Sequence, residues 1–108
     1  MNLYINDEFK VRDYLKKLSN GENVDFYRVL IQMSKGKFRE VNAKKWQDKV
    51  YEVYFKDSNR LFFLVENGTV VLLYACRKTK NKTTKKDSKN IMKRYRLYKR
   101  GISSQDKA

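Results

Sequence analysis

The feature that most constrains this fold is an Asn67-Gly68 pair between two apolar runs, residues 60–66 and 69–76. Both runs have the length of β-strands, and Asn-Gly is preferred in two-residue type I′ turns because both central residues need positive φ. The chain is therefore predicted to form a tight antiparallel hairpin here. Because such a turn fixes the register, Leu64 is expected opposite Val71 and Arg60 opposite Ala75.

Other strands and two helices are expected before the hairpin. Residues 51–56 alternate apolar and polar side chains, which is typical of a third strand, and residues 3–5 fit a short fourth strand. Asn6 can cap a first helix that ends at residues 19–21, and Asn23 can cap a second that ends at Gly36. The second helix is expected to carry four apolar residues on one side: Val24, Tyr27, Leu30 and Ile31. The two helices should form an antiparallel pair.

The C-terminal part begins with a helix-start signal. Thr84 and Asp87 have the Thr-x-x-Asp spacing of a capping box, and Gly101 is the expected stop. Both faces of the hairpin are apolar, so the helical pair should cover one face and this last helix part of the other. The expected fold class is α+β: a helical pair on a small antiparallel sheet of three to four strands, then a basic helix. Residues 1–101 form one domain, and residues 102–108 are expected to be a disordered tail.

Positive charge is concentrated at the end of the chain. Residues 77–100 hold twelve of the 26 basic residues and one acid, Asp87, so they carry +11 of the net charge of +14. The same stretch contains Ile91, Tyr95 and Tyr98 at helical spacing, which a disordered tail would lack. We therefore expect an ordered basic surface that binds a polyanion, either a nucleic acid or an acidic protein segment.

Composition narrows the chemistry. The chain has no histidine and one cysteine, Cys76, so imidazole catalysis, an intramolecular disulfide and a cysteine-based zinc site are excluded. Its four glycines cannot build a phosphate-binding loop, and no cofactor is expected. No run approaches the roughly 18 apolar residues of a membrane span, and the N-terminus is not a secretory signal. We expect a cytoplasmic protein that does not contact membranes.

Four segments resemble the RelE/ParE superfamily of type II toxins, most closely its HigB branch, which includes phage-derived host-inhibition proteins. Taken in order, they are similar to the strand LYEL, to YRVFY, to LLHGFxK and to QKTP: residues 50–53, 59–63, 72–78 and 81–84. The resemblance implies a metal-independent mRNA endonuclease that acts on ribosome-bound messenger and leaves a 2′,3′-cyclic phosphate. It also implies a cognate antitoxin, commonly with a helix-turn-helix domain, in a heterotetramer or larger complex.

Candidate catalytic residues follow from the same resemblance: Arg60, Arg77, Lys78, Lys82 and Tyr95. Arg60 matches a strand arginine that contacts the scissile phosphate; its alternative role is an ion pair with Glu66 or Asp57. Tyr95 could stack on a base, but its spacing also fits a core residue. Further RNA contacts are expected from one tyrosine and a set of lysines: Tyr98, Lys56, Lys80, Lys85, Lys86, Lys89 and Lys93.

The pattern departs from the family in three respects. The arginine that the HigB branch usually has after LYEL is replaced by Tyr54. Relatives carry two lysines on the strand before the arginine strand, where this chain offers Glu52, Tyr54 and Lys56, and the histidine of LLHGF is replaced by Tyr74. The general base is therefore unassigned. Two alternatives stay open: a ParE-like toxin that inhibits DNA gyrase without cutting RNA, and a basic nucleic-acid-binding module without catalysis.

Overall fold

The structure is a computed structural model that describes residues 1–56, 58–77 and 83–106. Its elements follow in chain order: β1 (Asn2–Ile5), the 3-10 helix η1 (Asp7–Phe9), α1 (Val11–Lys16), α2 (Asn20–Ser34), the 3-10 helix η2 (Phe38–Val41), β2 (Lys44–Gln47), β3 (Val50–Phe55), β4 (Asn59–Glu66), β5 (Thr69–Arg77) and α3 (Lys85–Asp106). Within these ranges no helix is both long enough and apolar enough to cross a bilayer.

The sheet is larger than predicted. The described chain forms five strands in the order β1-β5-β4-β3-β2, with β1 parallel to β5 and the other neighbours antiparallel. The expected strand at residues 3–5 is confirmed, but the expected number of three to four strands and an all-antiparallel sheet are wrong. β2 escaped prediction because its sequence, Lys-Lys-Trp-Gln, is mostly polar and exposed at the sheet edge.

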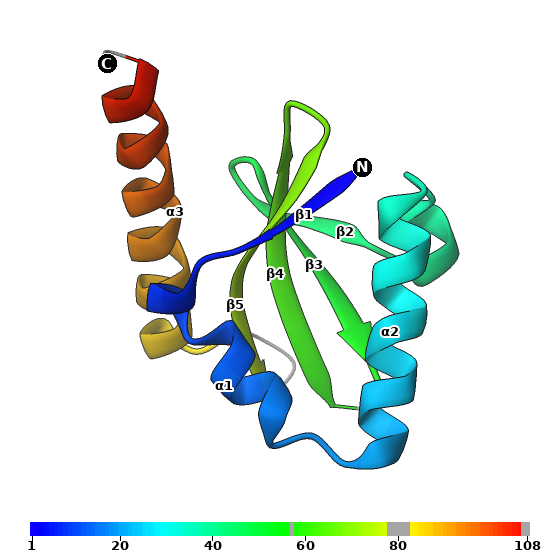
Figure 1. Cartoon of the computed structure of the whole chain (residues 1–108). Helices are drawn as coiled ribbons and strands as arrows, with labels where there is room; N and C mark the ends of the chain where they lie inside the picture. The colour runs from blue at the N-terminus through cyan, green and yellow to red at the C-terminus, as the bar shows by residue number, and fades with distance from the viewer. Residues whose placement is uncertain (57, 78–82, 107–108) are drawn as a thin grey trace.

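Helices cover both faces of the sheet, as the apolar hairpin required (Figure 1). On one face, Phe26 of α2 packs on Phe55 of β3 with ring centres 5.3 Å apart. On the other face, Tyr98 of α3 lies 6.0 Å from the ring of Tyr4 in β1. α1 packs against β5 and α2 against β3, so the two N-terminal helices meet different parts of the sheet. The predicted antiparallel helical pair is therefore wrong.

The hairpin turn is confirmed, and its register holds only near the turn. Asn67 and Gly68 have φ of 51° and 72°, as a type I′ turn requires. Leu64 pairs with Val71 as predicted, but the register shifts between Phe62 and Phe63, so that Arg60 pairs with Cys76 instead of Ala75. A β-bulge of this kind inserts one residue into one strand, which sequence patterning does not reveal.

The start of α2 corrects the N-terminal assignment. Ser19 is the N-cap: its Oγ accepts from the Glu22 N–H at 3.2 Å, and the Glu22 carboxylate accepts from the Ser19 N–H at 3.0 Å. Residues 19–21, expected to end one helix, thus begin the next, because a complete capping box is stronger than the single cap offered by Asn23. The first helix is also interrupted at Lys10, whose φ is 56°.

The side of α2 that packs on the core is not the apolar side that the sequence pattern singled out. The residues that reach the core are Phe26, Val29 and Met33. By contrast, Val24, Tyr27 and Ile31 are 72%, 61% and 51% exposed. Both sets recur at helical spacing, so periodicity could not choose between them. The helix therefore presents a second apolar side to solvent.

The cap of α3 is confirmed. The Thr84 Oγ accepts from the Asp87 N–H at 3.1 Å and donates to the Asp87 carboxylate at 2.9 Å. The predicted stop at Gly101 is wrong, since α3 continues to Asp106. Gly101 does not adopt positive φ, and an exposed helical glycine costs only about 1 kcal/mol.

Side chains of α3 that pack on the sheet should stabilise the fold more than those that face solvent. Ile91 is fully buried between α3 and the sheet, so Ile91→Ala should lower the free energy of unfolding by about 2–5 kcal/mol. Leu97→Ala is the matched control, because Leu97 lies on the same helix but is 42% exposed, and should cost under about 1 kcal/mol. Urea unfolding followed by circular dichroism measures both; equal losses would contradict this packing.

Candidate nucleic-acid interface

α3 separates its charges from its packing residues. The inward side includes Ile91, Tyr95 and Tyr98, which pack on the core. The exposed side carries six basic residues: Lys85, Lys86, Lys89, Lys93, Arg96 and Arg100. The predicted lysines of this helix therefore lie together on an ordered surface that solvent reaches.

One acid fixes the start of this helix to the sheet. The Tyr74 hydroxyl on β5 donates to the Asp87 carboxylate at 2.6 Å. Burial, together with this hydrogen bond, raises the pKa of Tyr74 to about 12, so the phenol stays a donor at neutral pH. Tyr74, which stands where relatives have histidine, thus anchors α3.

Two cations of the basic stretch serve packing. Arg94 donates from Nη1 to the Leu73 carbonyl at 3.0 Å, and its guanidinium carbon lies 4.7 Å from the centre of the Tyr74 ring. Burial lowers the pKa of Arg94, although an arginine remains charged under such conditions. Lys99 pairs with Glu66 at 2.6 Å. Arg94 is thus engaged in packing and the charge of Lys99 is balanced by Glu66, so fewer cations are free to bind a ligand than the sequence total suggests.

The predicted aromatic contacts lie partly inside the fold. Tyr95 and Tyr98 are half-buried and pack against the core, and Tyr98 also faces the ring of Tyr4. For Tyr95 this is the core position that its helical spacing offered as an alternative. Stacking of either ring on a base stays a prediction.

Arg60 is buried, with 4% of its surface exposed. Its Nη2 lies 2.5 Å from the Glu52 carboxylate and donates to the Thr83 Oγ at 2.9 Å. The rings of Tyr54 and Phe62 lie 5.4 Å and 5.1 Å from its guanidinium carbon. The ion-pair partner of Arg60 is thus Glu52 and not Glu66, which pairs with Lys99. The other expected partner, Asp57, lies outside the described residues. A phosphate could reach this guanidinium only after it had moved.

Sequence reasoning missed Glu52 and Thr83 as members of this cluster. Glu52 lies on the same face of the sheet as Arg60, on the neighbouring strand. Thr83 also accepts from the Trp46 indole N–H at 3.1 Å, so two donors hold it on the sheet. The alternation of side chains along β3 could have placed Glu52 on the same face as Arg60. The contact between Arg60 and Thr83 joins residues far apart in the sequence, and no sequence pattern indicated it.

Arg77 ends β5 on the opposite face of the sheet. It is exposed, and its Nη1 lies 3.0 Å from the Glu22 carboxylate. Glu22 also accepts from the Asn59 amide at 2.6 Å, and the fully buried Asn59 in turn accepts from the Tyr14 hydroxyl. The hydrogen bonds from Asn59 and then Arg77 lower the pKa of Glu22 to about 2. Arg77 is therefore anchored by a carboxylate that stays ionised.

The remaining candidates do not all fall in the described chain. Lys78, Lys80 and Lys82 lie outside it. Their flanking residues are both held, Arg77 by Glu22 and Thr83 by Arg60 and Trp46. Lys56 is exposed, and its backbone N–H donates to the Asp25 carboxylate at 2.5 Å.

This arrangement can bind an anionic polymer. Solvated lysine and arginine side chains on a rigid helix contact phosphates at low entropic cost and release counterions. At the first turn of α3, the macrodipole also favours anions. Among the described residues, the exposed basic side of α3 is the candidate site.

Comparison with known proteins yields one family. The family model described as "Phage derived protein Gp49-like (DUF891)" matches residues 13–96. No curated protein matches. Among solved structures, the conserved hypothetical protein HP0894 from Helicobacter pylori is similar, with a TM-score of 0.46 and 13% sequence identity over 71% of this chain and 93% of that chain.

The Glu22 network predicts an acid-dependent loss of stability. The pKa of Glu22 in the folded protein, about 2, lies below its ordinary value of 4.5. The ionised carboxylate therefore stabilises the fold above pH 4.5, and this stabilisation is lost as the pH falls towards 2. In the Glu22→Gln variant, the melting temperature should therefore decrease less between pH 4.5 and pH 2 than it does in the wild type. Glu8→Gln, at an exposed acid outside the network, is the matched control. If Glu22→Gln melts with the wild-type pH dependence, the network does not stabilise the fold.

Proposed function

We propose, from the premise that this chain belongs to the family of phage-derived Gp49-like proteins, that it is the toxin of a type II toxin–antitoxin system. We further propose that it cleaves messenger RNA without a metal, acts on ribosome-bound messenger, and is neutralised by a cognate antitoxin. The four segments similar to RelE and HigB toxins support this assignment.

The observation that carries the proposal is the row of exposed lysine and arginine side chains on α3. The row is attached to the sheet through the buried Ile91 and the Tyr74–Asp87 hydrogen bond. A surface that only needed to remain soluble would require neither this concentration of one sign nor a fixed geometry. A phosphate backbone fits both properties.

Cleavage requires an in-line attack at phosphorus. The ribose 2′-oxygen forms a bond to phosphorus while the bond from phosphorus to the 5′-oxygen breaks, leaving a cyclic phosphate. A neutral lysine amine takes the 2′-hydroxyl proton, and a lysine ammonium protonates the leaving oxygen. We assign these roles to Lys78, Lys80 and Lys82, since clustered cations lower each other's pKa and the chain has no histidine.

The two arginines are assigned different roles. Arg77 is exposed at the start of the lysine segment and can turn towards the phosphorane charge. Arg60 is a positioning residue: paired with Glu52, it donates to Thr83, the first described residue after these lysines. This role replaces the direct phosphate contact that the resemblance implied for Arg60.

One alternative function is favoured by a specific observation. Arg60 is occupied by Glu52, which leaves fewer cations for phosphate chemistry than RelE-like nucleases place there. A toxin that inhibits DNA gyrase needs the fold and the basic surface but no cleavage site. The test below separates this reading, and that of a non-catalytic binding module, from the nuclease.

The test compares three chains induced in bacteria: wild type, Lys80→Ala/Lys82→Ala and Lys35→Ala/Lys37→Ala. The last pair is the matched control, because Lys35 and Lys37 are exposed and lie after α2, away from α3. Growth is followed, messenger ends are mapped by primer extension, and purified chains are assayed with ribosomes in the presence of EDTA. Wild type and control should arrest growth and cut within coding regions, whereas the Lys80/Lys82 variant should cut about 100-fold more slowly or worse.

Three outcomes would contradict the proposal. Arrest without new messenger ends, together with inhibited DNA supercoiling, would identify a gyrase inhibitor. Soluble chains that neither arrest growth nor cut RNA would leave a binding module. Equal cutting by the Lys80/Lys82 variant, shown to be folded by circular dichroism, would remove these lysines from the mechanism.

A further inference from the structure

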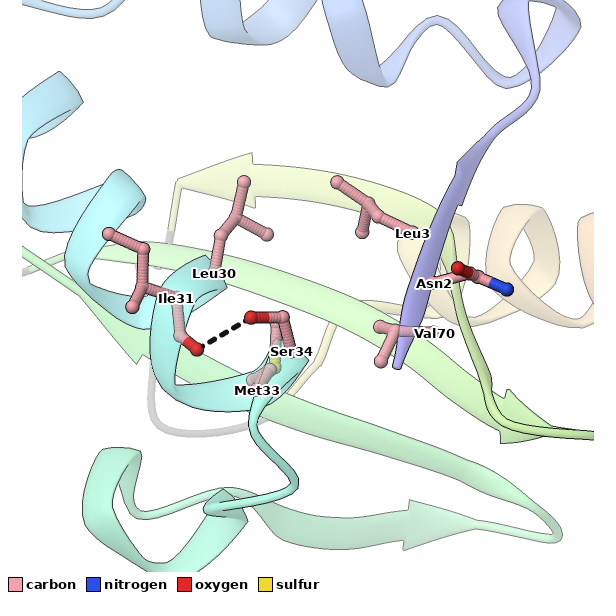
Figure 2. A pocket seen from close by; sticks show the side chains of 7 residues that line it. All are labelled: Asn2, Leu3, Leu30, Ile31, Met33, Ser34 and Val70. Carbon is pink, nitrogen blue, oxygen red and sulfur yellow. Dashed lines mark hydrogen bonds between the residues drawn. The ribbon is translucent and has the colours of Figure 1, made fainter.

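An apolar hollow lies between α2 and the edge strand β1. Figure 2 shows Leu3 on one side and Leu30 and Ile31 on the other, with Met33 and Val70 also in the lining. The hollow has a volume of about 170 Å³. Its walls come from β1 and from the exposed edge of α2, and the buried side chains of Met33 and Val70 form its floor.

A second hollow of about 550 Å³ continues the first. The two share Leu3 and Leu30, so together they form one groove along α2. Tyr27 on α2 and Leu15 on α1 line this second part. The charged residues described in the lining of both hollows are two cations, Arg12 and Lys16. The groove is thus mostly apolar and basic at one end, with Asn2, Ser34 and Asn23 as its uncharged polar residues.

α2 exposes large apolar side chains at this groove, which is unusual for a helix that already packs one apolar side on the core. Phe26, Val29 and Met33 connect α2 to the core, yet Tyr27 and Ile31 are 61% and 51% exposed. A surface helix normally shows one apolar stripe, and a second, contiguous one marks a contact surface. Leu3, at 44% exposure, extends this surface across to β1.

We propose that this groove binds an amphipathic helix of a partner protein, with its apolar side on Leu30 and Ile31 and acidic residues beside Arg12 and Lys16. A helix lying along α2 can place its ridges between Tyr27, Leu30 and Ile31, which recur at intervals of three and four residues. The basic end selects acidic residues by charge complementarity. A second copy of this chain is disfavoured because each copy carries +14.

The groove and the basic surface are separate. α1 and α2 cover one face of the sheet and α3 the other (Figure 1). A helix in the groove would therefore leave the row of cations on α3 uncovered, and a partner that silences the toxin needs a further segment to reach it. Only the identification of this partner with the antitoxin rests on the function proposed above.

The test uses the purified chain and a displayed library of 20-residue helical peptides with leucine at heptad positions and randomised residues between them. Peptides selected on the wild type should be rich in Asp and Glu and should shift the backbone amide NMR signals of α2 and β1. Ile31→Glu and Tyr27→Glu should weaken binding about tenfold or more. Val24→Glu is the matched control, because Val24 is 72% exposed on the same helix but lies outside both hollows, and should retain affinity within about twofold.

Several results would overturn the inference. They are selection of peptides without acidic enrichment, equal affinity of all three variants, or loss of binding only in Lys89→Glu/Lys93→Glu on α3. Concentration-dependent dimers that Ile31→Glu abolishes would identify a second copy as the occupant. If the messenger remains uncut while these peptides still bind the groove, the proposed nuclease fails and the groove stands.

Discussion

The hydrogen bond between the Tyr74 hydroxyl and the Asp87 carboxylate supports the arrangement on which the rest of the site depends. Asp87 is the only acid among residues 77–100, and it also accepts from Thr84 at the start of α3. A stretch with a charge of +11 repels itself and would favour an extended chain. Asp87 joins the cap, strand and helix at one carboxylate, and Ile91 is buried one turn later, so the described part of this stretch, α3, is held on the sheet with its basic side exposed.

Two further carboxylates organise the flanks of the lysine segment. Glu52 neutralises the buried Arg60, which in turn holds Thr83, and Glu22 holds Arg77. A buried ion pair adds little net stability compared with apolar residues of the same volume, so stability alone does not account for Glu52 and Arg60. Their geometric effect is specific, because it brings the end of β5 and the start of α3 to fixed positions.

Features set by neighbouring residues were predictable, and features set by distant contacts were not. The Asn67-Gly68 turn and the Thr84 cap are confirmed because a few consecutive residues determine them. The bulge beside Phe62, the strand β2 and the Arg60–Glu52 pair depend on how strands meet, which a single sequence does not encode locally. Sequence periodicity could not identify the side of α2 that packs on the core, because the helix carries two apolar stripes. The roles of Lys78, Lys80 and Lys82 stay predictions.

The central claim is that the exposed lysines of α3 bind RNA phosphates. The most direct measurement is the salt dependence of the affinity for a 20-nucleotide single-stranded RNA. The wild type is compared with Lys85→Ala/Lys89→Ala/Lys93→Ala and with a control of equal charge loss, Lys17→Ala/Lys35→Ala/Lys37→Ala. Loss of three phosphate contacts should reduce the slope of log K against log salt by about 2 in the first variant and leave the control unchanged. Equal slopes in the wild type and the α3 variant would contradict the account.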